Sequence, residues 1–315
     1  MTSDRLARRA LQVGREEARE VIKLRNAALR KRATAVRARR AAAPAQAAAP
    51  VDDARMRAVG DPATAGVLVA EGDSWFDYPL NDVLRLLEDQ HGYDVESVAH
   101  KGDSVEEMAY GRGQLEELTR RLEKLLRRGV VPRAILLSGG GNDVAGDEFG
   151  MLLNHAGSAI SGLNDQVVAG VIDQRVRLAY VTILNAVTLV CQARLGQTLP
   201  ILVHGYDYPV PDGRGFLGGW WFLPGPWLEP GFREKGFADM PERISMAKQL
   251  IDRFNVQLKN VAAMSEFAHV RYVDIRGSLS VGADYKTWWA NELHPTPRGF
   301  ERVTDRFAAA LAALP

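Results

Sequence analysis

A serine in the first third of the chain and a histidine near its end are the residues with the clearest capacity for chemistry. Ser74 stands in the segment Glu71-Gly72-Asp73-Ser74-Trp75, directly after the apolar run Val67-Leu68-Val69-Ala70, and this context predicts a strand-to-helix turn. His294 stands in the polar segment Asn291-Glu292-Leu293-His294-Pro295-Thr296. Because a serine hydroxyl is a weak nucleophile until a base takes its proton, the pair predicts a serine nucleophile with a histidine base.

Two glycine-containing blocks offer donors for the oxyanion that such an attack creates. Preorganised donors stabilise this charge, and we expect them to be the backbone amides of Ser74 and Gly102 and the side-chain amide of Asn142. Glycines at Gly102 and in Gly139-Gly140-Gly141 let the backbone approach a ligand closely. Each block alone is weak evidence, since a lone serine is more often a helix N-cap and a glycine run is often a turn. Their joint order along the chain carries the prediction.

Short apolar segments alternate with helical patterns through most of the chain. The candidate strands are Val67–Ala70, Tyr93–Ser97, Ala134–Ser138, Ile201–His204 and Val270–Asp274. Helical patterns cover Leu80–Gln90, Val105–Ala109 continuing into Leu115–Arg127, and Met240–Met264, with another before the C-terminus. Strands that are almost wholly apolar and separated by helices predict a mostly parallel sheet covered on both faces, hence a three-layer α/β/α sandwich. Ligands bind beyond the carboxyl ends of such strands, so four chemistry-bearing loops should converge on one edge.

The four blocks resemble those of the SGNH hydrolases, also called the GDSL esterase and lipase superfamily. The matching residues are Ser74 in Gly72-Asp73-Ser74, Gly102 in His100-Lys101-Gly102, Asn142 in Gly140-Gly141-Asn142-Asp143, and His294 in Leu293-His294-Pro295-Thr296. The resemblance runs from about residue 65 to the C-terminus. It implies a flavodoxin-like sandwich, no metal or organic cofactor, and acyl transfer through a serine ester. Typical substrates of the family are esters of short acyl chains, lipids or acetylated sugars, and thioesters also fit.

One position departs from that pattern. The family usually carries an aspartate three residues before the histidine, where this chain has Asn291. In serine proteases the corresponding Asp-to-Asn change costs about four orders of magnitude in turnover, because the histidine takes the wrong tautomer. Three explanations compete: Asn291 orients the imidazole through its side-chain carbonyl, Glu292 or Asp274 acts as an alternative acid, or a backbone carbonyl completes a Ser-His dyad. The three-residue offset favours Asn291.

The sequence therefore predicts a serine-dependent carboxylic ester hydrolase acting on an acyl ester of a lipid, sugar or small molecule. An acyltransferase with the same Ser-His machinery is an alternative, because a dry pocket lets an alcohol replace water. A third alternative is a binding protein that kept the fold but lost efficient catalysis, and the asparagine at position 291 is the observation that suggests it.

Two segments interrupt the alternation of strands and helices. Residues 146–197 exceed what one crossover needs and predict a helical cap or an extra packing layer. Residues 205–232, rich in Trp, Gly and Pro, predict an irregular loop over the edge that carries Ser74, acting as a lid plug or a substrate wall. The candidate substrate-binding residues are Trp75, Asp143, Tyr206, Trp220, Trp221, Trp288 and Trp289.

The N-terminal segment differs electrostatically from the rest of the chain. The first fifty residues carry thirteen Lys and Arg against four Asp and Glu, whereas the remainder carries 27 against 35. We interpret residues 1–40 as a basic helical arm, 41–62 as an Ala/Pro-rich linker and 63–315 as the hydrolase domain. A homo-oligomer contact or an anionic surface are possible roles for the arm, whereas nucleic acid is disfavoured because no aromatic residue in 1–50 can stack on bases.

Composition sets further expectations. A single cysteine, Cys191, excludes an intramolecular disulfide. The six histidines are scattered without zinc-ligand spacing, so we expect no metal and no cofactor. A secretory signal and a run of eighteen apolar residues are both lacking, which predicts a cytoplasmic location.

Overall fold

The computed structural model describes residues 27, 30–38, 41, 64–111, 113–218 and 223–315. Most of the predicted arm and nearly all of the predicted linker lie outside these residues, as do Trp220 and Trp221. The chain divides into a smaller unit of residues 1–66 and 87–94 and a larger unit of residues 67–86 and 95–315. The candidate site belongs entirely to the larger unit.

The centre of the fold is a five-stranded sheet with the order β2-β1-β3-β6-β7. Its strands are β1 Val67–Glu71, β2 Asp94–Ser97, β3 Ala134–Leu137, β6 Ile201–His204 and β7 Val270–Val273. Parallel pairing joins β1 to β3, β3 to β6 and β6 to β7. Counted along the chain the order is 2-1-3-4-5, the flavodoxin-like arrangement, so the predicted fold class is confirmed.

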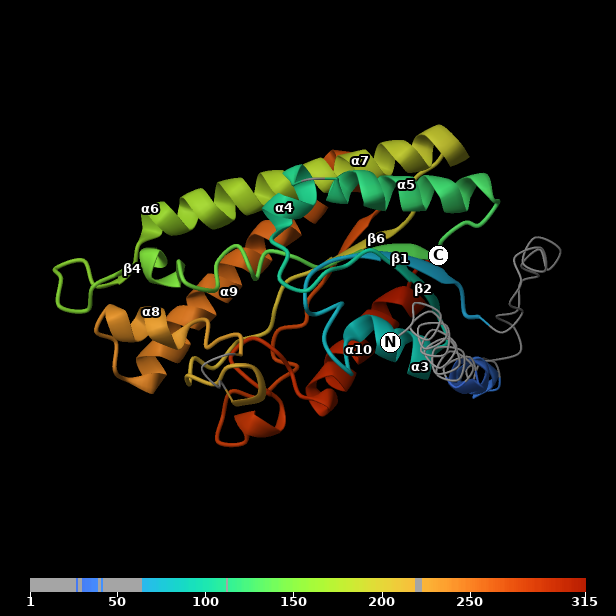
Figure 1. Ribbon diagram of the computed structural model, residues 1–315. Helices are drawn as coiled ribbons and strands as arrows, with labels where there is room; N and C mark the ends of the chain where they lie inside the picture. The colour runs from blue at the N-terminus through green and yellow to red at the C-terminus, as the bar shows by residue number, and fades with distance from the viewer. Residues whose placement is uncertain (1–26, 28–29, 39–40, 42–63, 112, 219–222) are drawn as a thin grey trace, which may run out of the picture. The chain divides into compact units, whose positions relative to one another are not determined.

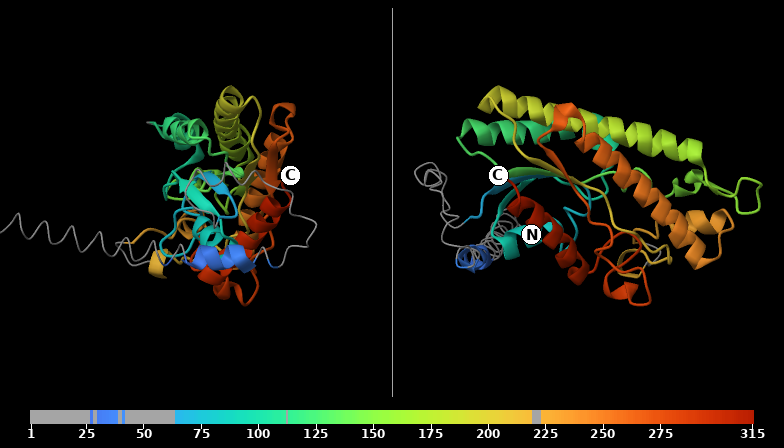
Figure 2. Two further views of the ribbon diagram at one scale, coloured as in Figure 1. Left: turned by 90° about the vertical axis from the view of Figure 1, so that its right-hand side faces the viewer. Right: turned by 180° about the vertical axis from the view of Figure 1, so that it is seen from behind.

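Helices cover both faces of this sheet (Figure 1). On one side lie α4 Val105–Tyr110, α5 Gln114–Arg127 and α7 Arg177–Leu195, and on the other lies α10 Pro297–Ala312. The helix α9 Met240–Ala262 contacts α7, β6 and β7, and the view from behind in Figure 2 shows its long diagonal course. Residues at helical spacing form the buried stripes, as with Phe300, Val303, Phe307 and Leu311 on α10.

The predicted elements agree closely with the observed ones. Every predicted strand matches an observed strand to within one residue at either end. The helix predicted from Leu80 starts later, as α3 Val83–His91, because the Asp82 carboxylate accepts the Arg85 amide at 2.8 Å and begins the helix there. Ser74 therefore sits on an irregular turn well before the helix, rather than at its start.

The segment 146–197 forms a packing layer and a small hairpin. It contains η1 Phe149–Leu152, the antiparallel pair β4 Leu153–Asn154 and β5 Gly162–Leu163, and a continuous helical stretch of α6 Asp165–Val168, η2 Ala169–Val176 and α7. Within the described residues, this stretch is the one helix long and apolar enough to cross a membrane by length and composition. It packs along α4, α5 and α9, as a core helix does, and buries Cys191.

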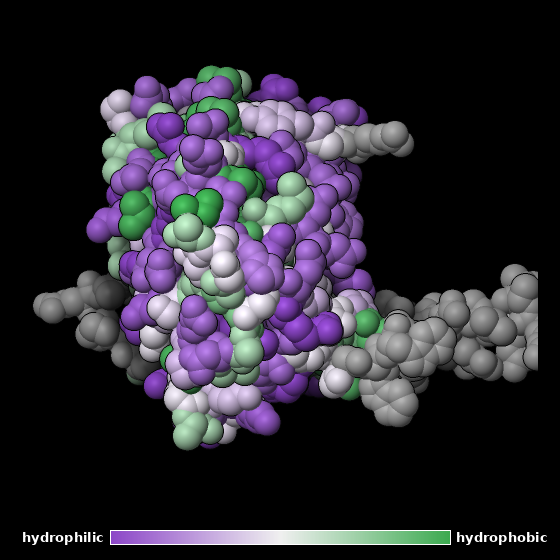
Figure 3. All heavy atoms as spheres, turned by 90° about the vertical axis from the view of Figure 1, so that its left-hand side faces the viewer, coloured by the Kyte–Doolittle hydropathy of each residue, from purple (hydrophilic) through white to green (hydrophobic). Residues whose placement is uncertain are grey.

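The remaining short elements lie in the connections after β6 and β7. They are η3 Phe216–Gly218, α8 Glu229–Glu234, η4 Ser265–Phe267 and η5 Tyr285–Thr287. Figure 3 faces the end of the molecule that carries α6, the β4–β5 hairpin and α8, and shows a mostly hydrophilic surface with apolar residues scattered among polar ones. Single apolar residues among polar ones are ordinary on a protein surface.

In the smaller unit, residues 30–38 are helical. Arg32 and Val36 are both buried, and the Arg32 guanidinium donates to the Asp94 carboxylate at 2.5 Å. Lys31 pairs with Asp89 at 3.3 Å. Part of the predicted basic helix thus packs within its own unit through an apolar contact and two ion pairs.

Candidate active site

Ser74 lies on the turn that follows β1, and Asp73 builds that turn. The buried Asp73 carboxylate accepts the Trp75 amide at 3.0 Å and the Ser138 hydroxyl at 2.9 Å, and its backbone carbonyl accepts the Phe76 amide at 3.0 Å. Burial raises the pKa of Asp73, while its hydrogen bonds oppose that rise. Because these contacts occupy Asp73, it supports the serine and does not face the reacting atoms.

Three side chains form a hydrogen-bonded line between the first and last blocks. The Ser74 Oγ lies 2.7 Å from His294 Nε2, although the two residues are 220 positions apart. On the far side of the ring, His294 Nδ1 lies 3.0 Å from Asn291 Oδ1. This is the nucleophile, base and orienting-group geometry of a serine hydrolase, with an amide in the orienting position.

The surrounding contacts fix the orientation of the Asn291 amide. Its Oδ1 accepts the backbone amides of Leu293 at 3.0 Å and His294 at 2.9 Å, and its Nδ2 donates to the Tyr78 hydroxyl at 3.2 Å. Turning the amide over would set an NH₂ group against two N–H donors. The oxygen therefore faces the imidazole, so Nδ1 carries the proton and Nε2 is free to accept one from Ser74.

Aromatic rings enclose the histidine. The Tyr78 ring stacks on His294 with a centroid distance of 4.4 Å, and Trp227 meets it edge-on at 5.4 Å. Burial disfavours the imidazolium and lowers the pKa of His294 to about 3. Burial thus favours the neutral imidazole in the resting site at weakly acidic and neutral pH.

Glu292 does not reach the imidazole, which corrects its predicted role as an alternative acid. Its fully buried carboxylate accepts four backbone amides, those of Gly213, Trp227, Leu228 and Glu229, at 2.7 to 3.0 Å. These amides belong to the segment predicted as the aromatic loop. Glu292 therefore fastens that loop, and through it the wall beside His294.

Asp274 is likewise turned elsewhere. Its carboxylate pairs with the Arg276 guanidinium at 2.7 Å, and this contact lowers the pKa of Asp274. Among the described residues, the hydrogen-bond partners of the His294 ring are Ser74 and Asn291. The alternative-acid prediction for Asp274 is therefore corrected as well.

The predicted oxyanion donors come together beside Ser74. The backbone N–H groups of Ser74 and Gly102 have no acceptor within the part of the chain that the structure describes. Gly102 has a φ of +93°, a conformation that L side chains rarely adopt. Asn142 donates one side-chain N–H to the Asp103 carbonyl at 2.9 Å, which holds its amide in place. Two free backbone donors and a fixed side-chain amide suit a developing negative charge.

Helix α7 supports the loop that carries Asn142. The Tyr180 hydroxyl donates to the Gly139 carbonyl at 2.9 Å, and the Tyr206 hydroxyl donates to Asp73 while accepting the Gly141 amide at 3.2 Å. The turn at Ser74 and the loop at Asn142 are thus tied through buried hydroxyls. Such second-layer contacts hold reacting groups in place.

A cavity of about 320 Å³ opens at the triad. Its lining includes both Ser74 and His294, together with Gly102 and Asn142. The other lining residues, mostly apolar, are Tyr78, Pro79, Lys101, Phe216, Leu223, Pro224, Trp227 and Leu293. Four of these residues, from Phe216 to Trp227, come from the predicted aromatic loop, which therefore forms one wall of the cavity.

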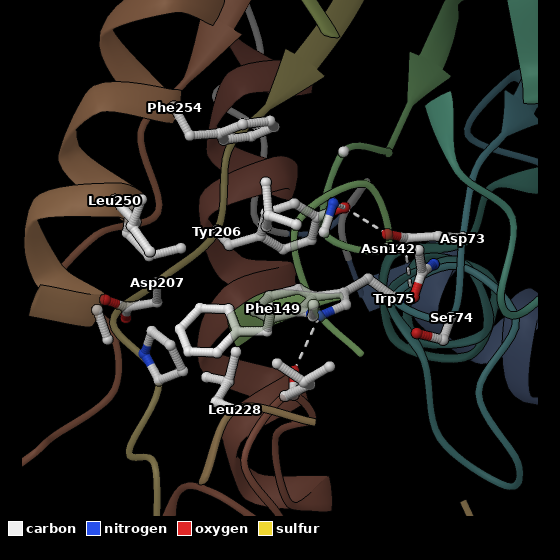
Figure 4. A pocket seen from close by; sticks show the side chains of 18 of the residues that line it. Asp73, Ser74, Trp75, Asn142, Phe149, Tyr206, Asp207, Leu228, Leu250 and Phe254 are labelled. Carbon is white, nitrogen blue, oxygen red and sulfur yellow. Dashed lines mark hydrogen bonds between the residues drawn. The ribbon is translucent and has the colours of Figure 1, made fainter. Parts of the chain in front are cut away.

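The predicted substrate-binding residues divide into three groups. Trp75, Tyr206 and Trp289 line a second, smaller cavity next to Ser74 (Figure 4), while Trp220 and Trp221 lie outside the described residues. The other two line neither cavity. Asp143 accepts the amides of Val105 and Glu106 at the start of α4, and Trp288 donates to Asp284 beneath the Arg298 guanidinium.

Sequence reasoning missed Tyr78 and did not single out Trp227. Tyr78 follows Ser74 by four residues in a segment without periodicity, so its only signal was proximity to the nucleophile. Trp227 lay inside the predicted loop, but its place beside His294 depends on the path that the Glu292 contacts impose. Neither position follows from a local pattern.

The chain is similar in structure to several solved proteins. No protein-family model matches the chain, and no curated protein matches it. Similar structures include TesA, with 16% identity, 79% of this chain and 99% of that chain covered, and a TM-score of 0.42. A catalytic mutant of Axe2, an acetylxylan esterase from Geobacillus stearothermophilus, has 15% identity over 79% of this chain and 94% of that chain, with a TM-score of 0.42. LAE5, an alpha/beta hydrolase enzyme from a Lake Arreo metagenome, has 14% identity over 80% and 97%, with a TM-score of 0.42.

Proposed function

We propose that this protein is a serine-dependent carboxylic ester hydrolase. The observation that carries the proposal is the line from Ser74 Oγ to His294 Nε2 at 2.7 Å and from His294 Nδ1 to Asn291 Oδ1 at 3.0 Å. The line ends in a cavity with apolar walls and unpaired backbone donors. A carbonyl group bound in this cavity would lie within reach of the nucleophile, the base and the oxyanion donors, with Asn291 behind the base.

The reaction follows from this geometry. Ser74 Oγ bonds to the ester carbonyl carbon as its proton passes to His294 Nε2, and the carbonyl oxygen takes the negative charge beside the Ser74, Gly102 and Asn142 donors. The carbon–alkoxy bond then breaks, and the leaving oxygen takes the proton from Nε2. Water attacks the resulting serine ester with the same base, which releases the acid and restores Ser74.

An amide stabilises the imidazolium less than a carboxylate does, and two features of the site offset part of the difference. The Asn291 oxygen directs its dipole at the Nδ1 proton from 3.0 Å. The Tyr78 ring offers its face to the histidine, and a cation over an aromatic face gains about 0.5 to 2 kcal/mol. Burial also keeps the base unprotonated before the reaction.

Acyl transfer to an alcohol is the second candidate, favoured by the walls of Phe216, Leu223 and Trp227 that limit water around the serine ester. Product analysis of an ester reaction with added alcohols separates the two activities. A new ester as the main product indicates transfer, and free acid indicates hydrolysis.

The proposal is tested by intact-mass spectrometry after treatment with a fluorophosphonate. We expect one adduct on the wild-type chain, because an activated serine attacks the phosphorus, and none on Ser74→Ala. Ser265→Ala is the matched control, since Ser265 bonds to the exposed Glu266, and it should retain the adduct. A folded wild-type chain without an adduct, or an adduct that persists in Ser74→Ala, would contradict the proposal.

A further inference from the structure

Two cavities meet at Ser74, and they differ in size and in whether His294 lines them. Ser74, Asn142 and Leu293 line both the cavity of about 320 Å³ and the second cavity of about 60 Å³. His294 lines the larger cavity and does not line the smaller one. Figure 4 shows Ser74 at one end of the smaller cavity and Leu250 and Phe254 at the other.

The position of the base assigns the two cavities to the two halves of an ester. In the tetrahedral intermediate, the carbon on Ser74 Oγ carries an oxyanion, an alkoxy oxygen and an acyl chain. The alkoxy oxygen must receive the proton held by His294 Nε2, so the alcohol half has to occupy the cavity that His294 lines. The oxyanion faces its own donors. The acyl chain must therefore extend into the smaller cavity.

The walls of the smaller cavity suit hydrocarbon. Its buried apolar lining includes Phe149, Ile172, Leu228, Leu250 and Phe254. The two carboxylates on its wall, Asp73 and Asp207, have their oxygens occupied. Asp73 accepts the hydroxyls of Ser138 and Tyr206, and Asp207 accepts the amides of Gly277 and Leu279, both at 2.7 Å. An apolar chain would therefore enter without leaving a buried polar group unpaired.

The volume sets the length of that chain. An engineered apolar cavity of about 150 Å³ holds benzene, with six carbons, so about 60 Å³ holds about two or three carbons by the same measure. The larger cavity exceeds it about fivefold and carries aromatic rings and Lys101 on its wall. The alcohol half can thus be much bulkier than the acyl half.

We propose that the smaller cavity is the acyl subsite and that it selects short, apolar acyl groups such as propionyl and butyryl, whereas the larger cavity takes the alcohol. This inference rests on the proposed esterase function. It identifies the substrate as an ester of a short fatty acid with a larger, partly aromatic or apolar alcohol.

One substitution made in each cavity gives a matched test. Leu250→Ala enlarges the smaller cavity and Leu223→Ala enlarges the larger one, so the two variants lose the same atoms. kcat/KM is measured on p-nitrophenyl acetate, butyrate, hexanoate and octanoate. In the wild type we expect butyrate to exceed octanoate by about tenfold or more, since one methylene too many in a pocket costs about 10- to 200-fold. Leu250→Ala should raise the octanoate to butyrate ratio about tenfold, and Leu223→Ala should leave it unchanged.

A second variant covers the case in which Leu250→Ala does not fold, because Leu250 is buried in α9. Ala145 is half-buried on the wall of the smaller cavity, and Ala145→Val narrows it without emptying the core. This variant should lower butyrate turnover about tenfold while sparing acetate.

Fluorophosphonate labelling of the same preparations separates the possible failures. In one outcome all the enzymes are labelled while the octanoate to butyrate ratio changes in Leu223→Ala instead of Leu250→Ala, or changes in neither. That result would overturn the subsite assignment and leave the esterase proposal standing. Enzymes that neither label nor cleave any of the four esters would overturn both. A wild-type optimum at octanoate would also contradict the assignment.

Discussion

Asn291 and Glu292 are consecutive buried residues near the end of the chain, and their side chains make quite different hydrogen bonds. The neutral amide stands beside the base, with its oxygen 3.0 Å from His294 Nδ1. The carboxylate, which has the charge suited to a triad acid, points away and accepts four backbone amides of the loop that contains Gly213 and Trp227. The difference teaches that hydrogen-bond partners, rather than charge or nearness in sequence, identify the side chain that orients the proposed base.

The comparison has an electrostatic consequence. Because no carboxylate among the described residues faces the ring, burial acts without opposition and lowers the pKa of His294 to about 3. The nearby carboxylates do not change this, because Asp73 is turned to Ser138 and Tyr206 and Glu292 is turned to the loop. In this arrangement the proposed base stays neutral before the reaction, but the imidazolium that forms during the reaction is stabilised less than it would be by a carboxylate.

The largest expected effect follows removal of the amide. Asn291→Ala deletes the Asn291 oxygen, which accepts the Nδ1 proton and the backbone amides of Leu293 and His294, so the tautomer is no longer fixed. We expect kcat to fall by about 10²- to 10⁴-fold, in the range of orienting-group changes in serine proteases, with KM nearly unchanged. Steady-state ester hydrolysis measures the effect. A loss below threefold would show that Asn291 does not orient the base.

Tyr78→Phe is the matched smaller perturbation at the same corner. It removes the hydroxyl that accepts the Asn291 Nδ2 proton at 3.2 Å and keeps the stacked ring. A neutral hydrogen bond contributes about 0.5 to 1.5 kcal/mol, so kcat should fall by about two- to tenfold.

Glu292→Gln should act on stability and on the cavity wall instead. The NH₂ group of the new side chain would face amide donors where the carboxylate now accepts four of them, which leaves at least one donor unpaired. We expect a loss of about 1 to 3 kcal/mol in the free energy of unfolding, and KM should rise more than kcat falls because Trp227 belongs to the wall. Chemical denaturation and steady-state kinetics measure both.

Glu301→Gln is the control for that variant, because Glu301 is exposed on α10 and its replacement should change neither quantity. A Glu292→Gln enzyme with normal stability and a kcat as low as that of Asn291→Ala would invert the roles assigned to the two residues.

The sheet and the order of the reacting blocks were predictable from the sequence. Short apolar runs such as Ile201–His204 indicated the strands, because such runs between helices are typical of buried parallel strands. Parallel strands bring their carboxyl ends to one edge of the sheet. Ser74, Gly102, Asn142 and His294 follow from that topology and from the family resemblance.

The environment of the base was not predictable. Tyr78 reaches His294 from an irregular turn, and Glu292 finds its amides in a loop that lacks periodicity. The smaller cavity is built from η1, η2 and α9, whose side chains are far apart in sequence and showed only a core pattern. Contacts of this kind depend on loop paths and packing, for which a single sequence carries no local signal.

The most direct test of the account is the pH dependence of kcat/KM for Asn291→Asp beside the wild type. Turnover requires neutral His294, so it falls as pH drops through the pKa of that group. A carboxylate beside Nδ1 raises that pKa, and its second oxygen can accept from the Tyr78 hydroxyl, so the variant should keep or exceed wild-type activity at pH 8 while its acid limb moves to higher pH. A collapse of activity to the Asn291→Ala level, or an acid limb that does not move, would contradict the assignment of Asn291 as the group that orients the base.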